Sequence, residues 1–221
     1  MLSQTERTFL IAIEPPLLAE QTATVVARLR ANWPEERLME LADSSSPVIA
    51  RMAARCLGYI GTRIHARKLT GLLRHADETV VEAAENGLWS IWMRGYEGAD
   101  HERLREAIGR VNAGEFEAGL ALLSELIAAE PNEPEAYHQR ALALHSMQRY
   151  EEAEAAYLAT LERNPAHFAA AAGLGHLHVE QGEFEAALDF YKQALEIHPR
   201  LKEIREIVPQ LEKALNRRDV A

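Results

Sequence analysis

The sequence has too few cysteines for a disulfide framework or a cysteine-rich metal site, and it has no long uncharged stretch for a membrane span. Its 221 residues include a single cysteine, Cys56, which excludes a disulfide framework and a cysteine-rich zinc site. No stretch long enough to cross a membrane, about 18 residues, is free of charge. The apolar run 9–13 is too short for the core of a signal peptide. We therefore expect a cytoplasmic protein without a membrane span.

Motifs of the common enzyme chemistries are also absent. There is no Gly-x-Ser-x-Gly nucleophile elbow, no His-Glu-x-x-His zinc motif and no glycine-rich phosphate loop. The serines 44–46 precede Pro47 and are better explained as a turn and helix N-cap than as nucleophiles. Cys56 sits in a helical apolar pattern, which favours a buried structural thiol. We predict a non-enzymatic protein with no catalytic residue, no cofactor and no metal site.

Acidic residues, in contrast, are abundant and unevenly placed. There are 34 Asp and Glu against 24 Lys and Arg, a net charge of −10. Residues 1–97 have 11 basic and 12 acidic residues, whereas residues 98–221 have 13 and 22. The run from Arg51 to Arg74 holds six basic residues and no acid. It is either a solvated helix surface or a face for an acidic partner. Nucleic acid is disfavoured because the overall acidity repels phosphate.

A repeat of 34 residues runs through the C-terminal half. Three prolines mark it at this spacing: Pro131, Pro165 and Pro199. The units, each ending two residues after its proline, are 100–133, 134–167 and 168–201. Position 20 of each unit is small, which lets two helices approach closely, and position 17 is aromatic and fills the space between hairpins. Because proline also stops the second helix of each unit, the pattern predicts a stack of helical hairpins.

This pattern resembles the tetratricopeptide repeat (TPR), and it matches best in the second and third units. In the first unit, Glu106 and Arg110 stand where the family has apolar residues. The segment Leu201–Asn216 resembles the solvating helix that caps such arrays. We expect Pro209 to kink or restart that helix.

A weaker repeat of 31 residues occurs in the N-terminal half, where 38–61 realigns with 69–92. The stretch 53–61 resembles the second helix of short HEAT-like repeats, the bacterial kind also found in phycobilin lyases. One further helix is expected over 17–31, after two consecutive prolines. The dipeptide Trp33-Pro34 then predicts a helix break.

Together the halves predict an all-α fold, an α-solenoid. HEAT-like helical hairpins over 1–97 are followed by three TPR units and a C-terminal capping helix over 98–221. We expect about eleven or twelve helices and no strands, because no alternating apolar pattern occurs. Trp89 and Trp92 share one helix face near the junction, so we predict that they pack in a seam between the two solenoids.

Histidines are unusually numerous, with nine in the chain. His167 and His198 fall at repeat ends and are expected to be exposed, whereas His178 is expected to fill the core. Three others fall on the concave face that a TPR array would have: His138, His145 and His176. This placement favours contact with a polar ligand. It does not predict a metal site, because no adjacent carboxylate pair completes a ligand set.

The TPR resemblance implies a non-catalytic adaptor that holds a peptide or protein segment in its concave groove. The predicted contact residues lie on the first helix of each hairpin: Leu104, Ile108, Val111, Glu135, His138, Leu142, His145, Ala169, Ala172, His176 and Val179. The family's carboxylate clamp for chaperone C-termini is absent. The positions that hold its Lys, Asn and Arg residues are here Leu104, Ile108, Gln139, Ala169 and Gly173.

Other functions remain open at this point. One is a HEAT-like module that binds an acidic partner, or nucleic acid, through the Arg51–Arg74 face. Another, implied by the HEAT-like resemblance alone, is a lyase or chaperone-lyase for a tetrapyrrole, although those proteins lack a TPR tail. The concave face is alternatively covered by water or by another copy of the chain.

Overall fold

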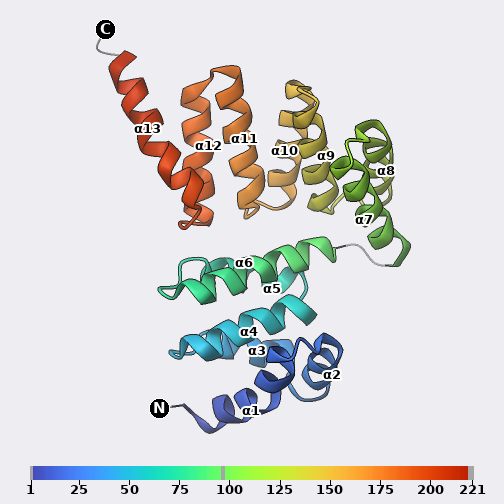
Figure 1. Cartoon of the computed structure of the whole chain (residues 1–221), viewed down its shortest axis with the longest axis vertical. Coiled ribbons are helices and arrows are strands. Elements are labelled where there is room, and N and C mark those ends of the chain that lie inside the picture. Colours follow the sequence, from blue (N-terminus) through green and yellow to red (C-terminus); the bar gives the residue numbers. More distant parts are fainter. Residues whose placement is uncertain (1, 96–97, 219–221) are drawn as a thin grey trace. The chain divides into compact units, whose positions relative to one another are not determined.

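The computed structural model describes residues 2–95 and 98–218, and every regular element in these residues is a helix (Figure 1). This confirms the all-α prediction, with thirteen helices in the described residues against the eleven or twelve expected. The chain divides into two compact units, Met1–Arg94 and Gly95–Ala221. None of the helices in the described residues is long and apolar enough to cross a membrane.

The first unit holds six helices. They are α1 (Gln4–Leu18), α2 (Thr22–Asn32), α3 (Glu35–Leu41), α4 (Pro47–Ile60), α5 (Arg63–Leu72) and α6 (Glu78–Met93). The helices α4 and α6 pack most extensively against each other. Glycines make this possible, because a Cβ on Gly58 would lie only 2.9 Å from the Cα of Gly87. Arg94 adds a polar tie, since its guanidinium donates to the carbonyl oxygens of Gly58 and Gly61 at 2.5 and 2.8 Å.

The start of this unit differs from the prediction. The prolines 15 and 16 lie inside α1, whose N-terminus is fixed by a capping box between Ser3 and Glu6. Because both prolines lie near its C-terminal end, the helix loses little, and their carbonyls accept N–H groups from Ala19 and Gln21. The helix expected over 17–31 therefore begins later, at Thr22. The break predicted at Trp33-Pro34 is confirmed.

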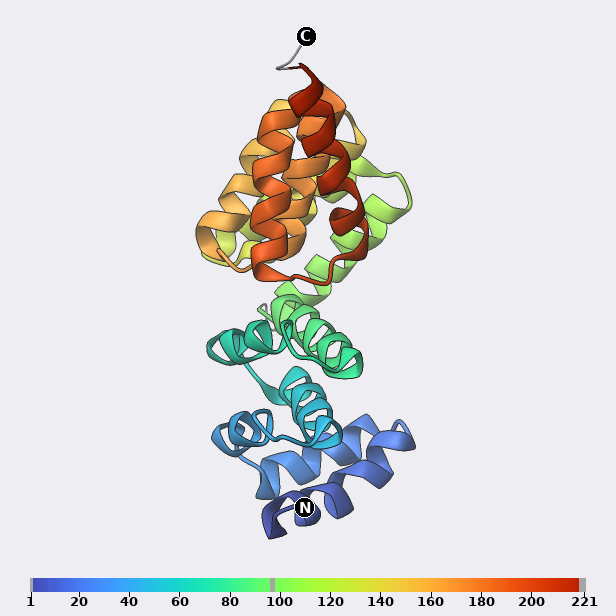
Figure 2. The same ribbon diagram turned by 90° about the vertical axis from the view of Figure 1, so that its left-hand side faces the viewer.

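The second unit holds three helical hairpins and a final helix. The hairpins are α7 (Gly98–Asn112) with α8 (Phe116–Ala129), α9 (Pro134–Ser146) with α10 (Tyr150–Arg163), and α11 (Phe168–Gln181) with α12 (Phe184–Ile197). The last helix, α13 (Lys202–Arg218), packs on α12, and Figures 1 and 2 show these orange to red helices side by side. Tyr157 and Tyr191 are fully buried, and each ring occupies the space that a side chain at Gly173 or Gly175 would need. The predicted stack of hairpins is thus confirmed.

The capping helix is confirmed, but the restart expected at Pro209 as an alternative to a kink does not occur. Helix α13 runs continuously through Pro209, which lies on its exposed face. Water there can solvate the carbonyl that the missing N–H leaves free. The opposite face is held by Ile204, Ile207 and Val208, which pack against a cluster around Tyr191.

Candidate functional site

A groove in the second unit contains a cavity of about 380 Å³. Helices α9 and α11 and the start of α13 supply most of its wall, and Tyr157 of α10 completes it. The lining residues are His138, Leu142, His145, Tyr157, Phe168, Ala169, Ala172, Gly173, His176, Leu201, Lys202, Glu203 and Ile204. This cavity brings together six of the eleven residues predicted to contact a partner.

Two tyrosine–histidine pairs line or border this groove. The hydroxyl of Tyr191 lies 2.8 Å from Nδ1 of His176, and that of Tyr157 lies 3.4 Å from Nδ1 of His145. Burial raises the pKa of Tyr191 to about 12, so its phenol stays protonated and donates to His176. Burial also lowers the pKa of His176, which favours the neutral ring. With Nδ1 accepting, Nε2 carries the proton and serves as a hydrogen-bond donor.

Beside the cavity lies a buried polar cluster formed by Glu135, His138 and His167, which are 0%, 3% and 0% exposed. His138 Nδ1 is 3.3 Å from one carboxylate oxygen of Glu135, and His167 Nε2 is 3.4 Å from the other. Burial by itself raises the pKa of the Glu135 carboxyl, but its hydrogen bonds with His138 and His167 outweigh burial and lower it. Burial lowers the pKa of His167 to about 4, so that ring is neutral near pH 7.

The predicted exposure of His167 and His198 is wrong, because both are buried. His167 is the N-cap of α11, and its Nδ1 accepts the N–H of Ala170 at 3.1 Å. His198 packs edge-on against Phe168, with ring centroids 5.0 Å apart. The prediction that His178 fills the core is confirmed.

The other five predicted contact residues do not line the cavity. Two of them, Leu104 and Glu135, are fully buried and expose no side-chain surface. The residues Ile108, Val111 and Val179 are half-buried and lie outside the cavity. The prediction missed the residues from Leu201 to Ile204, because it considered only the first helices of the hairpins.

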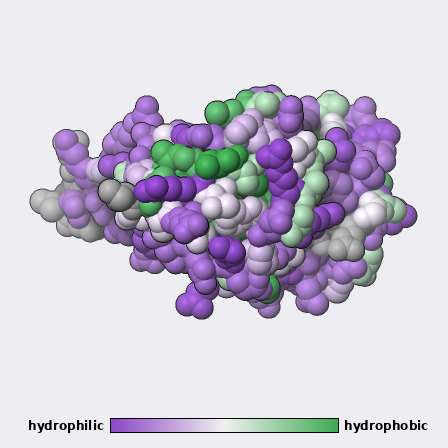
Figure 3. Space-filling model, turned by 90° about the horizontal axis from the view of Figure 1, so that it is seen from below, coloured by the Kyte–Doolittle hydropathy of each residue, from purple (hydrophilic) through white to green (hydrophobic). Residues whose placement is uncertain are grey.

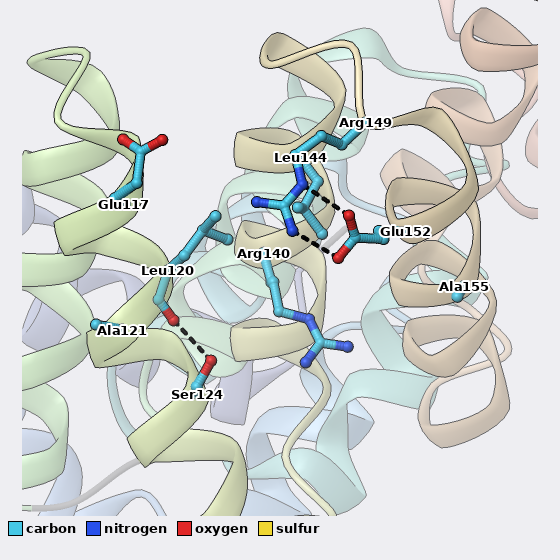
Figure 4. A pocket seen from close by; sticks show the side chains of 9 residues that line it. All are labelled: Glu117, Leu120, Ala121, Ser124, Arg140, Leu144, Arg149, Glu152 and Ala155. Atoms are coloured by element: carbon cyan, nitrogen blue, oxygen red, sulfur yellow. Dashed lines mark hydrogen bonds and ion pairs between the residues drawn. The ribbon is translucent and has the colours of Figure 1, made fainter.

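A second cavity, of about 470 Å³, lies between α8, α9 and α10 (Figure 4). Arg149 and Glu152 form a two-pronged ion pair at its edge, at 2.7 and 2.6 Å. Figure 4 shows Arg140 extending into the space between α8 and α10, and its buried Nε has no hydrogen-bond partner among the described residues. Its guanidinium lies 5.6 Å from the ring centre of Tyr137. This cavity contains none of the predicted contact residues.

Four residues of the basic run of the first unit line two cavities. Arg51 and Arg55 line a cavity together with Glu82, whereas Arg67 and Lys68 line another with Asp43. Lys68 also forms an ion pair with Asp43 at 2.5 Å. Acidic side chains therefore accompany both parts of the run. Figure 3 shows one face of the molecule, on which most side chains are hydrophilic and the apolar ones gather in a few small groups.

Trp89 and Trp92 both belong to α6, and their rings meet edge-on with centroids 5.2 Å apart. Trp92 is buried and Trp89 is half-buried. Cys56 is also buried, as predicted, and burial raises the pKa of its thiol to about 12. The thiol therefore stays protonated and is a poor nucleophile.

Comparison with known proteins identifies the repeats. The tetratricopeptide repeat family model matches residues 104–159 and 138–201, all in the second unit. Residues 104–201 are thus TPR repeats. The HEAT-like character of the first unit stays a prediction.

Relatives by sequence match less than half of the chain. "DnaJ protein P58IPK homolog A" of Oryza sativa subsp. japonica is 34% identical over 94 residues, which are 41% of this chain. The match spans only 20% of that relative's length.

Solved structures agree on the fold. The first TPR of Spaghetti (RPAP3), bound to the HSP90 peptide SRMEEVD, has a TM-score of 0.50 at 18% identity. The match covers 53% of this chain and 93% of that one. The first TPR domain of the human RPAP3 protein has a TM-score of 0.50 at 17% identity, over 55% of this chain and 96% of its own.

Proposed function

We propose that the protein is a non-catalytic adaptor that binds a peptide segment in the groove of its second unit. The observation that carries this proposal is the cavity between α9, α11 and α13, which coincides with the face predicted to bind a partner. TPR arrays present such concave surfaces, and the RPAP3 domain of similar fold binds a peptide. The other functions considered above have no comparable observation in their favour.

The lining of the cavity indicates the kind of segment. Its lining includes two small, half-buried residues, Ala169 and Ala172, which leave room for a bulky side chain. Leu142 provides apolar contact at the rim, and Lys202 and Glu203 provide charges of opposite sign. We infer a segment anchored by one large apolar side chain, with polar groups that meet the histidines, Lys202 and Glu203 at the edge.

The preferred segment differs from the HSP90 peptide. In SRMEEVD the C-terminal residues are largely acidic, and an acidic peptide requires cationic or amide groups in the groove. Of the five clamp positions in this chain, only Gln139 is polar. Its side chain is already engaged, because Nε2 donates to the Glu135 carboxylate at 2.7 Å. We therefore expect SRMEEVD to be a poor ligand.

The test begins by selecting a binding peptide from a displayed random library and measuring its affinity by fluorescence anisotropy. Leu142→Arg places a charge at the cavity and should weaken binding at least tenfold. The matched control is Leu158→Arg on α10, because Leu158 is similarly exposed, at 43% against 38%, and lines none of the cavities described above. It should bind normally. Equal binding by both variants, or tight binding of SRMEEVD, would contradict the proposal.

A further inference from the structure

The cluster of Glu135, His138 and His167 has the chemistry of a metal site. Each residue offers one ligand atom, and these atoms all lie within 4.8 Å of one another. Two imidazoles and one carboxylate are a ligand set that zinc uses in proteins, with a fourth position left for water or another ligand. We propose that this cluster binds one divalent first-row transition ion, for which Zn²⁺ is the probe.

The spacing of the ligand atoms supports this assignment. Hydrogen bonds to a carboxylate are usually about 2.7–2.9 Å long. In the cluster, the His138–Glu135 and His167–Glu135 distances are 3.3 and 3.4 Å. A tetrahedral ion with bonds of about 2.1 Å separates its ligand atoms by about 3.4 Å. Each histidine nitrogen thus lies at about the ligand–ligand distance from one of the two Glu135 oxygens, beyond the length of a tight hydrogen bond. All three ligand atoms lie within 4.8 Å of one another, so a shift of one side chain brings a single oxygen and both nitrogens around one ion.

The repeat itself provides a control for the alternative that the cluster only serves the fold. Glu135, His138 and His167 occupy positions 2, 5 and 34 of the second unit. The same positions of the third unit are Ala169, Ala172 and Leu201. The TPR hairpin thus forms without polar residues there. Since burying a carboxylate is costly unless it is well compensated, a bound cation adds to the compensation that the hydrogen bonds of His138, His167 and Gln139 supply.

Neighbouring groups hold the ligands in place. Gln139 Nε2 donates to one oxygen of Glu135 at 2.7 Å and fixes the carboxylate. His167 Nδ1 accepts the N–H of Ala170, so its Nε2 carries the proton in the metal-free protein. When an ion binds Nε2, the proton of that nitrogen moves to Nδ1. Nδ1 then no longer accepts a hydrogen bond, so the Ala170 N–H loses this partner. Loading should therefore change the Ala170 amide signal.

The cluster also has a route for the ion, because His138 lines the groove cavity. The ligand set selects among cations. Imidazole nitrogen suits Zn²⁺, Co²⁺ and Ni²⁺, whereas Mg²⁺ and Ca²⁺ require mainly oxygen ligands. This site goes beyond peptide binding and does not depend on it.

The direct test is to treat the full chain with chelator, dialyse it against Zn²⁺, Mg²⁺ or Ca²⁺, and measure bound metal by mass spectrometry. We expect one equivalent of Zn²⁺ and neither of the other two ions. Co²⁺ should give the intense visible bands of a tetrahedral site. Failure to retain Zn²⁺ would overturn the proposal, whether or not the groove binds a peptide.

Variants separate this site from the other histidines. His167→Asn removes a ligand but keeps an efficient N-cap for α11, so it should fold and lose the bound Zn²⁺. Glu135→Gln should do the same, and His138→Gln provides a third test if Glu135→Gln does not fold. The controls are His145→Gln and His176→Gln, whose side chains line the groove outside the cluster. Retention of Zn²⁺ by His167→Asn, or its loss from both controls, would contradict the assignment.

Discussion

The second and third repeats share one architecture but have opposite chemistry at the groove. Both are hairpins with a buried tyrosine at position 24, Tyr157 in one and Tyr191 in the other. The second repeat places a buried Glu–His–His cluster beside the cavity, whereas the third has alanine and leucine at the same positions. The comparison shows that the hairpin is specified by its helix contacts and does not require polar residues at positions 2, 5 and 34.

The largest loss of stability should follow from removing the buried tyrosine at position 24, which both repeats share. Tyr157→Ala and Tyr191→Ala each remove a fully buried ring, and we expect a loss of about 3–5 kcal/mol in the free energy of unfolding of the second unit. Urea denaturation followed by circular dichroism measures it. If only one of the two variants were destabilised, the repeats would not share a common support.

The next prediction converts the second repeat into the third. In the presence of chelator, His167→Leu alone leaves the Glu135 carboxylate buried with one donor fewer, which should cost about 3 kcal/mol. The triple variant E135A/H138A/H167L carries the third repeat's residues and leaves no buried charge. It should be more stable than the single variant in the same denaturation experiment. A triple variant less stable than His167→Leu would show that the hairpin needs the cluster.

A smaller effect is expected at the glycines of the helix contacts. A Cβ on Gly175 would lie 2.4 Å from the ring of Tyr191, so Gly175→Ala should cost about 1–3 kcal/mol. Gly109→Ala in α7 is the matched control, because nothing lies within 4 Å of its added Cβ. It should be neutral or stabilise the helix by up to about 1 kcal/mol. Thermal melting of the two variants tests this difference, and equal melting temperatures would argue against tight packing at Gly175.

The smallest expected effect concerns pH. Burial lowers the pKa of His176, so below the ordinary histidine pKa of about 6.5 the unfolded chain binds a proton that the folded protein resists. The stability that the neutral His176 ring permits is therefore fully present above about pH 6.5 and is lost as the pH falls below it. His176→Gln should therefore lose less stability than the parent protein between pH 7 and pH 5. An identical pH dependence would mean that this histidine does not titrate as described.

Much of this organisation is readable in the sequence, since the 34-residue proline spacing predicts the hairpins and the resemblance to TPR arrays implies the capping helix. The buried polar cluster is not readable in the sequence, because His167 and Glu135 lie 32 residues apart and meet only when α9 and α11 pack. The feature that could have indicated this cluster is the position of His167 directly before α11, where it serves as the N-cap and does not lie in an exposed turn. For α1, the Ser3–Glu6 capping box is the sequence feature that indicates where the helix begins.

Photo-crosslinking tests most directly whether the groove of the second unit holds a peptide segment. A photoreactive phenylalanine analogue replaces Leu142 in one protein and Leu158 in another, and each is irradiated with the selected peptide. We expect a crosslink from position 142, at the cavity, and none from position 158. A crosslink from position 158 alone, or from neither position with a peptide that binds tightly, would contradict this expectation.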